Sequence, residues 1–200
     1  MTITKLERQK RRKDRWSVFV DGEFAFGLDE VDLLYYKLSE GSDISHERFE
    51  YLLDQVVFTR ASQKALDFLS HRPRTVNEVE KKLSEDYNRD IVARVMDMLH
   101  EYRYVDDASY AEEYAKERVN AGYGFRKIEW ELRERGVDQC FIDPALEEVS
   151  SLQRQSALAA FKARYGNKSG MDAKEKAGAF NYLLRRGFDR ETISDVFHES

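Results

Sequence analysis

The side chains best placed to do chemistry are five carboxylates that lie close together in the sequence: Glu101, Asp106, Asp107, Glu112 and Glu113. Paired carboxylates can hold a divalent cation or divide acid and base roles in hydrolysis. Asp106 and Asp107, however, stand directly before Ala108, where an apolar pattern of helical period begins. Carboxylates at a helix start accept hydrogen bonds from free backbone N–H groups. We therefore predict helix-start residues here, and no metal site.

Other catalytic motifs are absent because the sequence lacks the residue spacing that they require. The four histidines show no HExxH motif, and Cys140 is the only cysteine, so zinc ligands are not expected. The string GNKSG at residues 166–170 lacks the GK[ST] order of a phosphate-binding loop, and no nucleophile elbow occurs. We expect no catalytic residue, no metal and no cofactor, and a protein that is not an enzyme.

Basic side chains offer a different chemistry, the binding of polyanions. Residues 1–15 hold seven basic and two acidic side chains, and residues 160–190 hold eight and three. Residues 75–115 hold eleven acidic and five basic side chains, and the whole chain has a formal net charge of −5. Basic ends are suited to a polyanion, and an acidic middle is suited to a basic protein surface. The alternative is that these charges only solvate helix faces.

The basic residues that we predict to make such contacts lie in four stretches: Lys10, Arg11, Arg12, Lys13, Arg15, Arg72, Arg74, Arg126, Lys127, Arg135, Arg185 and Arg186. Arg72 and Arg74 flank Pro73 in an expected loop, where guanidinium groups can take phosphates or carboxylates bidentately. The alternative for this pair is that two exposed loop arginines cap helix carbonyls.

The elements that must position these residues begin with a hairpin. Apolar residues alternate from Trp16 to Gly27 on both sides of Asp21-Gly22, a dipeptide that tolerates positive φ at both positions. From Asp29 onward the apolar spacing is helical, with Ser45 as a candidate N-cap. A hairpin followed only by helices is therefore expected.

An internal repeat organises the helices. LRERGVDQCFI at residues 132–142 matches LLRRGFDRETI at residues 183–193 with an offset of 51 residues. Gly136 and Gly187 are suited to left-handed positions that end a helix, and Asp138 and Asp189 to N-caps of the helix that follows. A helix begun at Gln139 would meet Pro144 in its second turn, so the alternative is a helix start at Asp143 with Pro144 at its first position. Each copy thus reads as three helices, which must stack on neighbouring copies to bury their faces.

The predicted fold is mainly α, an elongated array of tandem three-helix repeats with an N-terminal β-hairpin-containing helical extension. Residues 1–60 form the extension, with a basic arm, the hairpin and two helices. Residues 61–105, 106–150 and 151–200 form repeats 1, 2 and 3.

Four strings in this order resemble the RecX family of regulators of the RecA recombinase: ITKLERQKRRKDRWSVFVDGEFAFG, ALDFLSHRPRTVNEVEKKL, YVDDASYAEEYAKER and GYGFRKIEWELRERGV. The likeness is best from Ala65 to Val137, and Tyr165 to Met171 departs most. The resemblance implies tandem three-helix repeats and a non-catalytic protein that binds RecA along the groove of its filament on single-stranded DNA. It also implies that strand exchange, ATP hydrolysis and co-protease function are modulated, usually downward.

The expected partners are therefore the RecA filament and, through the basic residues, single-stranded DNA as an auxiliary partner. The chain has no apolar run that could span a bilayer, so we expect a cytoplasmic protein. A monomer is expected as well. The alternative function is a sequence-independent nucleic-acid-binding helical module that acts without RecA. In that module the helix of residues 126–135 would enter a groove, but Glu129, Glu131 and Glu134 on it would be repelled by phosphate.

Overall fold

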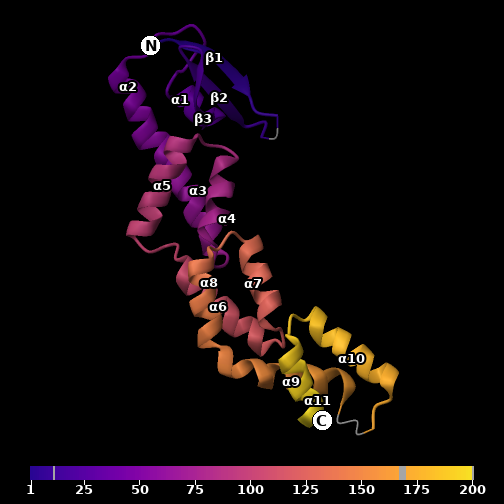
Figure 1. The fold of residues 1–200 in the computed structure, drawn as a ribbon. Coiled ribbons are helices and arrows are strands. Elements are labelled where there is room, and N and C mark those ends of the chain that lie inside the picture. The colour runs from indigo at the N-terminus through magenta and orange to yellow at the C-terminus, as the bar shows by residue number, and fades with distance from the viewer. Residues whose placement is uncertain (11, 167–169, 200) are drawn as a thin grey trace. The chain divides into compact units, whose positions relative to one another are not determined.

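The computed structural model describes residues 1–10, 12–166 and 170–199. Three short strands come first, and helices fill most of the remaining described chain, as Figure 1 shows. The predicted fold class, mainly helical with strands near the amino terminus and three-helix repeats after them, is confirmed.

The chain divides into two compact units. The amino-terminal unit consists of Met1–Arg74 and Glu78–Val105, and the carboxyl-terminal unit consists of Thr75–Asn77 and Asp106–Ser200. A short stretch at the start of one helix thus belongs to the unit that follows it in the chain.

The sheet of the amino-terminal unit is antiparallel, in the order β1 (Ile3–Arg8), β2 (Arg15–Val20) and β3 (Glu23–Asp29). Asp21 and Gly22 join β2 to β3 with φ angles of 50° and 90°. Both angles are positive, as a two-residue hairpin turn with its tight twist requires. The predicted hairpin is therefore confirmed.

Strand β1 corrects the prediction of a basic arm at residues 1–15. Its backbone pairs with β2, and its first side chain, Ile3, is buried opposite Val20. The other β1 side chains are largely exposed, and Lys5 forms an ion pair with Glu7 at 2.8 Å. Because charged residues occupy this edge strand, its sequence carries no apolar alternation. Only the connection between β1 and β2 remains of the expected arm.

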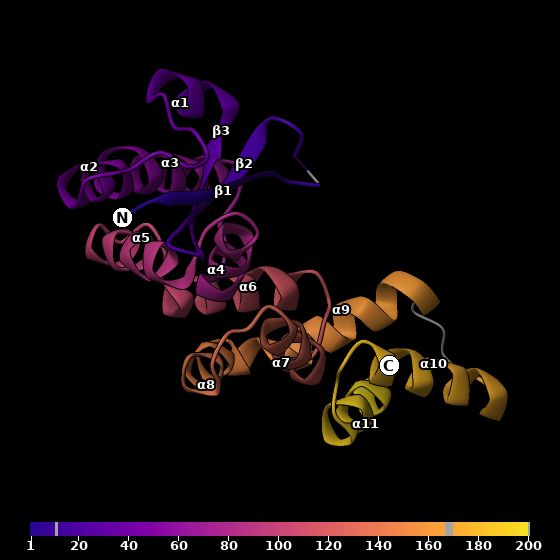
Figure 2. The same ribbon diagram turned by 90° about the horizontal axis from the view of Figure 1, so that it is seen from above.

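Helices complete the amino-terminal unit. They are α1 (Glu30–Tyr35), α2 (His46–Tyr51), a π-helical segment (Leu52–Val57), α3 (Phe58–Ser70), α4 (Val76–Ser84) and α5 (Arg89–Glu101). Ser45 caps α2 as predicted, since its hydroxyl accepts the N–H of Arg48 at 3.2 Å. Helix α3 packs against α5. Both lie below the strands of this unit in Figure 1, and Figure 2 shows the same helices from above. The buried residues Ala65, Leu83 and Leu99 form part of this core.

Among the described residues, the carboxyl-terminal unit contains six further α-helices and a short 3-10 helix (Ser150–Leu152). The α-helices are α6 (Asp107–Asn120), α7 (Phe125–Glu134), α8 (Gln139–Glu148), α9 (Gln153–Tyr165), α10 (Ala173–Arg185) and α11 (Arg190–Glu199). One apolar cluster lies among α6, α7 and α8 and a second among α9, α10 and α11. Helix α8 begins at Gln139 and includes Pro144, so the suggested start at Asp143 is wrong.

Gly136 and Gly187 end the second helix of two successive three-helix groups, as predicted from the repeat. Their φ angles are 81° and 92°, a region that side chains other than glycine rarely adopt. A Cβ at Gly136 would lie 2.2 Å from the Asn77 side chain, and one at Gly187 would lie 2.4 Å from the Lys127 nitrogen. Both glycines therefore serve as turns and as points of close contact.

Candidate functional site

The predicted contact residues fall into three places along the described chain, and Arg11 lies outside the described residues. The first place is the connection between β1 and β2, the second is the turn before α4, and the third is the carboxyl-terminal unit. The geometry at each place decides which side chains remain available to a partner.

Arg15 is buried, which corrects its prediction as a contact residue. It is only 2% exposed, and its guanidinium donates to Asp29 Oδ1 and to the Gly27 carbonyl, both at 3.1 Å. The guanidinium also lies over the Tyr87 ring, 4.6 Å from its centroid. Arg15 therefore holds the sheet to the helices and cannot reach a polyanion.

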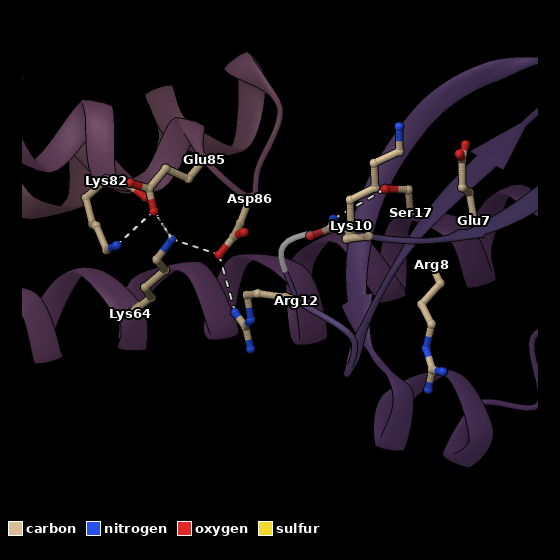
Figure 3. A pocket seen from close by; sticks show the side chains of 10 residues that line it. Glu7, Arg8, Lys10, Arg12, Ser17, Lys64, Lys82, Glu85 and Asp86 are labelled. Atoms are coloured by element: carbon tan, nitrogen blue, oxygen red, sulfur yellow. Dashed lines mark hydrogen bonds and ion pairs between the residues drawn. The ribbon is translucent and has the colours of Figure 1, made fainter.

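A pocket of about 460 Å³ lies between the β1–β2 connection and helices α3 and α4 (Figure 3). Asp86 at its wall accepts from Lys64 Nζ at 2.8 Å and from Arg12 Nη1 at 3.4 Å. Lys82 forms an ion pair with Glu85 at 2.8 Å. Lys64, Arg12 and Lys82 at this pocket are therefore held in ion pairs that join the sheet to the helices, whereas Lys10 also lines the pocket.

The charges in this pocket shift the acidity of Asp86. Burial alone raises the pKa of this carboxyl. The hydrogen bond and charge of Lys64, together with the charges of Arg15 and Arg12, lower it by more, so the pKa of Asp86 is below its usual value. The pKa of Arg12 is raised, first by its hydrogen bond to Asp14. In contrast, Lys10 and Lys13 are exposed on the same connection.

Arg72 and Arg74, the pair beside Pro73, each have an intramolecular partner. Arg72 Nη2 donates to Glu78 Oε1 at 3.0 Å, and its Nη1 donates to the Pro73 carbonyl at 3.1 Å. Arg74 lies over the Phe68 ring, 3.9 Å from the centroid. The two guanidinium groups therefore do not form an open clamp for one phosphate.

The carboxyl-terminal unit brings four of the predicted residues together. The first turn of α7 meets the last turn of α10, because the Gly124 N–H donates to the Arg186 carbonyl at 2.9 Å and the Arg126 N–H donates to the Gly187 carbonyl at 3.1 Å. These bonds place Arg126 and Lys127 beside Arg185 and Arg186. We call this place the α7–α10 junction.

The side chains at the α7–α10 junction divide into structural and accessible ones. Arg186 Nη1 donates to the carbonyls of Ala121 and Gly122 at 3.0 and 2.9 Å, and its guanidinium lies over Tyr123. Arg186 therefore ties the two three-helix groups together. Arg126 and Arg185 are exposed.

Helix α7 is less negative on its surface than its sequence suggests. Glu131 faces α6, where it accepts from Arg118 Nη2 at 2.7 Å and from the Tyr114 hydroxyl at 2.9 Å. Burial raises the pKa of Glu131, but these hydrogen bonds and the Arg118 charge lower it below its usual value overall. Glu129 forms an ion pair with Arg133 at 2.8 Å. The predicted repulsion of phosphate by three glutamates is therefore overstated.

Arg135 is half-buried at the end of the same helix. Its guanidinium lies 5.1 Å from the centroid of the Tyr114 ring. Its carbonyl accepts from the Thr75 hydroxyl at 2.7 Å and from the Asn77 side chain at 3.2 Å. This residue thus contributes to packing at the start of α4.

Trp130 is an exposed aromatic residue on α7 that the sequence prediction missed. Its neighbours Ile128 and Leu132 are fully buried. Residues two positions from a buried pair spaced i,i+4 lie on the opposite face of a helix. That spacing was the signal that could have placed Trp130 on the surface.

The carboxylate pair behaves as predicted. Asp106 Oδ1 accepts the N–H groups of Ala108 and Ser109 at 3.0 and 3.1 Å and so caps α6. Asp107 Oδ1 accepts the N–H of Val76 at 2.9 Å. Both carboxylates therefore serve helix starts.

Metal clusters and membrane-spanning helices are both absent from the described residues. No group of three or more potential metal ligands lies together in the part of the chain that the structure covers. Across the same residues, no helix is both long and apolar enough to cross a membrane.

Three family models match the chain in order. The model of the regulatory protein RecX N-terminal domain matches residues 1–45, that of the first RecX three-helix domain matches residues 61–99, and that of the second matches residues 106–146.

Curated relatives and solved structures agree with these matches. The regulatory protein RecX of Clostridium acetobutylicum is 32% identical over 99% of this chain and 95% of its own length. That of Clostridioides difficile is 29% identical over 98% and 94%. A crystal structure of regulatory protein RecX matches with a TM-score of 0.66 and 26% identity over 98% of each chain. RecX from Lactobacillus salivarius matches with a TM-score of 0.63 and 26% identity over 71% of this chain and 95% of that one.

Proposed function

The chain belongs to the RecX family of regulatory proteins, and from this premise we propose that it binds the RecA recombinase and its filament on single-stranded DNA. Bound there, it lowers the strand-exchange, ATPase and co-protease activities of the filament. The observation that carries the proposal is the match to regulatory proteins over 99% of the chain, at 32% identity. Those relatives are named as regulators, and the chain acts as one without catalysis of its own.

The repeated architecture supports a filament as the partner. Residues 1–60 act as an extension, and residues 61–105, 106–150 and 151–200 act as three modules of one kind. A filament presents the same protomer surface again and again, so similar modules can contact successive protomers. Such contacts lock neighbouring protomers or block the incoming duplex, and they thereby slow ATP turnover or cap filament growth.

Single-stranded DNA is an auxiliary partner in this proposal. The exposed cations Lys10, Lys13, Arg126 and Arg185 supply the phosphate contacts. Phosphate contacts release counterions, so this part of the affinity falls as salt rises. The protein acts in the cytoplasm as a monomer.

The test is ATP hydrolysis by the host's own RecA on single-stranded DNA, with this protein added from far below to well above the RecA concentration. We expect inhibition at a small fraction of the RecA concentration, because one bound molecule affects several protomers. The titration is run at two salt concentrations, so that loss of the DNA contribution is visible.

The alternative function, a nucleic-acid-binding module that acts without RecA, gives a different result. The exposed cations at the α7–α10 junction are the observation that favours it. In that case ATP hydrolysis falls only when the protein saturates the DNA, and raised salt abolishes the effect. Binding to DNA-free RecA would then also be absent in a pull-down, which would contradict the proposed function.

A further inference from the structure

Trp130 is the most exposed aromatic residue among the described residues of the carboxyl-terminal unit, at 53% exposure. Ile128 and Leu132 anchor the opposite side of α7 in the core with α6 and α8. Leaving a large ring in water has no benefit for stability, because its apolar surface is favoured inside. The helix therefore presents an indole ring of which about half the surface is exposed.

The charges on α7 are of both signs, and Lys127 forms an ion pair with Glu131 at 3.6 Å. Lys127 Nζ lies over the ring, 3.9 Å from its centroid, and Arg126 is exposed one residue earlier. Arg133 follows three positions after Trp130, on the same side of the helix, with Glu129 as its ion-pair partner. Glu134 is the remaining exposed carboxylate of α7.

Two backbone hydrogen bonds bring a further cation, from α10, near the start of α7. The N–H groups of Gly124 and Arg126 donate to carbonyls of Arg186 and Gly187, which fixes the end of α10 against the start of α7. Arg185, exposed in the last turn of α10, is held in this way near the first turn of α7. Trp130 follows Arg126 by four positions, on the same side of α7, and Arg185 lies near the first turn of that helix. Exposed aromatic rings combined with cations are what proteins use to bind unpaired nucleotides.

We propose that Trp130 is a stacking platform for an unpaired base of single-stranded nucleic acid, with Arg126 and Arg185 contacting the flanking phosphates. The inference rests on the proposed function, since it assigns the DNA contact of the filament-bound protein to one ring. Stacking needs an open base face, and a duplex offers none because its bases already stack on each other. The site is therefore selective for single strands and tolerant of sequence.

The fluorescence of the ring itself tests the proposal. The chain has two tryptophans, and Trp16 is the other. The Nε1 atom of Trp16 makes no hydrogen bond within the described residues, so Trp16→Phe removes none. In this variant Trp130 is the sole tryptophan. We expect a single-stranded oligothymidylate to quench its emission, and a duplex of the same length to leave it nearly unchanged.

A second variant measures the contribution to affinity. Trp130→Leu, with Trp16 intact, should bind the oligothymidylate about tenfold more weakly, and Trp130→Phe should retain part of the affinity. The matched control is Tyr102→Leu, which removes a ring that is 65% exposed in the other unit. This control should bind like the unaltered protein. Circular dichroism confirms that each variant is folded.

The outcomes separate this inference from the proposed function. Absent quenching, together with unchanged affinity of Trp130→Leu, overturns the stacking platform. If this variant still inhibits RecA at low ratios, the proposed function survives that failure. If quenching occurs but the unaltered protein does not inhibit RecA, the stacking platform stands and the proposed function is wrong.

Discussion

Arg185 and Arg186 are adjacent in sequence but serve different purposes. Arg186 donates to two carbonyls and lies over aromatic rings, whereas Arg185 is exposed. A hydrogen bond from a charged group contributes about 1.5–3 kcal/mol, so we expect Arg186→Ala to lower the free energy of unfolding by about 2 kcal/mol. Arg185→Ala should change it by less than about 0.5 kcal/mol. Urea denaturation measures the free energy of unfolding of both variants. Equal decreases would contradict the assignment of a structural role to Arg186 alone.

Arg185→Ala also tests the role of its charge in binding. We expect this variant to lose more affinity for the DNA-bound filament than for free RecA, because only the former presents phosphate. A side-by-side titration measures both affinities. Arg190→Ala, which removes another exposed arginine of the same unit, is the control and should lose less.

Asp86 makes stability depend on pH. Its pKa is lowered in the folded protein, so its ion pairs with Lys64 and Arg12 stabilise the fold above the usual value of 3.8. This contribution disappears as the pH falls through the lowered folded value. We expect the free energy of unfolding to fall over that acid range, and to fall less steeply in Asp86→Asn. Asp90→Asn, at an exposed aspartate, is the control and should keep the full slope.

Individual side chains were predictable where local geometry decides their role. Asp106 stands directly before a helix, so its cap could be predicted from spacing alone. Arg15 could not be recognised as buried, because its partners Gly27 and Asp86 are distant in sequence and come together only in the fold. Glu131 was misjudged for the same reason, since its partner Arg118 lies on another helix.

At the scale of elements, the glycine that ends α7 combines a turn with a close approach. Gly136 and Gly41 share a φ of 81°, but a Cβ at Gly41 meets nothing within 4 Å, whereas one at Gly136 meets Asn77 at 2.2 Å. Left-handed backbone costs other residues about 1–2 kcal/mol. Gly41→Ala should reduce the free energy of unfolding by about that amount, and Gly136→Ala should reduce it clearly more. Thermal unfolding measures both, and similar reductions would mean that the approach to Asn77 is unimportant.

The role of the connection between β1 and β2 in DNA binding is better tested by substitution than by deletion. Removing residues 1–15 would take away β1 and uncover the sheet, so weaker binding would not report on charge. Lys10→Gln with Lys13→Gln keeps the strand. We expect the slope of log affinity for single-stranded DNA against log salt to flatten by about 0.7 for each phosphate that the variant no longer neutralises. An unchanged slope would exclude this connection from DNA binding.

The elements themselves were predictable to different degrees. The hairpin followed from Asp21-Gly22 between alternating apolar residues, and the helices followed from their apolar period. Strand β1 was missed because its exposed charged side chains hide the alternation. Of the two starts considered for α8, the one at Gln139 is correct and the one at Asp143 is wrong, because Pro144 is tolerated inside the helix.

For the whole molecule, two units with separate cores should unfold separately. Leu83 and Leu183 lie near the end of the second helix of their three-helix groups, are fully buried and belong to different units. Replacement of a buried leucine by alanine costs about 2–5 kcal/mol. We expect Leu83→Ala and Leu183→Ala to shift different transitions in differential scanning calorimetry. A single transition shifted by both variants would show that the units unfold together.

The repeat was the most informative feature of the whole sequence. The match of residues 132–142 with residues 183–193 predicted both glycine turns, which the structure bears out. It could not predict which exposed cations stay unpaired, because that depends on interactions between helices from different copies.

The joint between successive three-helix groups keeps its acceptor and changes its donor. The carbonyls of Arg135 and Arg186 are 51 residues apart, and each accepts a hydrogen bond from the start of an earlier helix. The donor is the Thr75 hydroxyl in one case and the Gly124 N–H in the other. A backbone carbonyl is present whatever the side chain, so the acceptor survives substitution at its own position. The donor position can therefore change during divergence of the copies while the joint is kept.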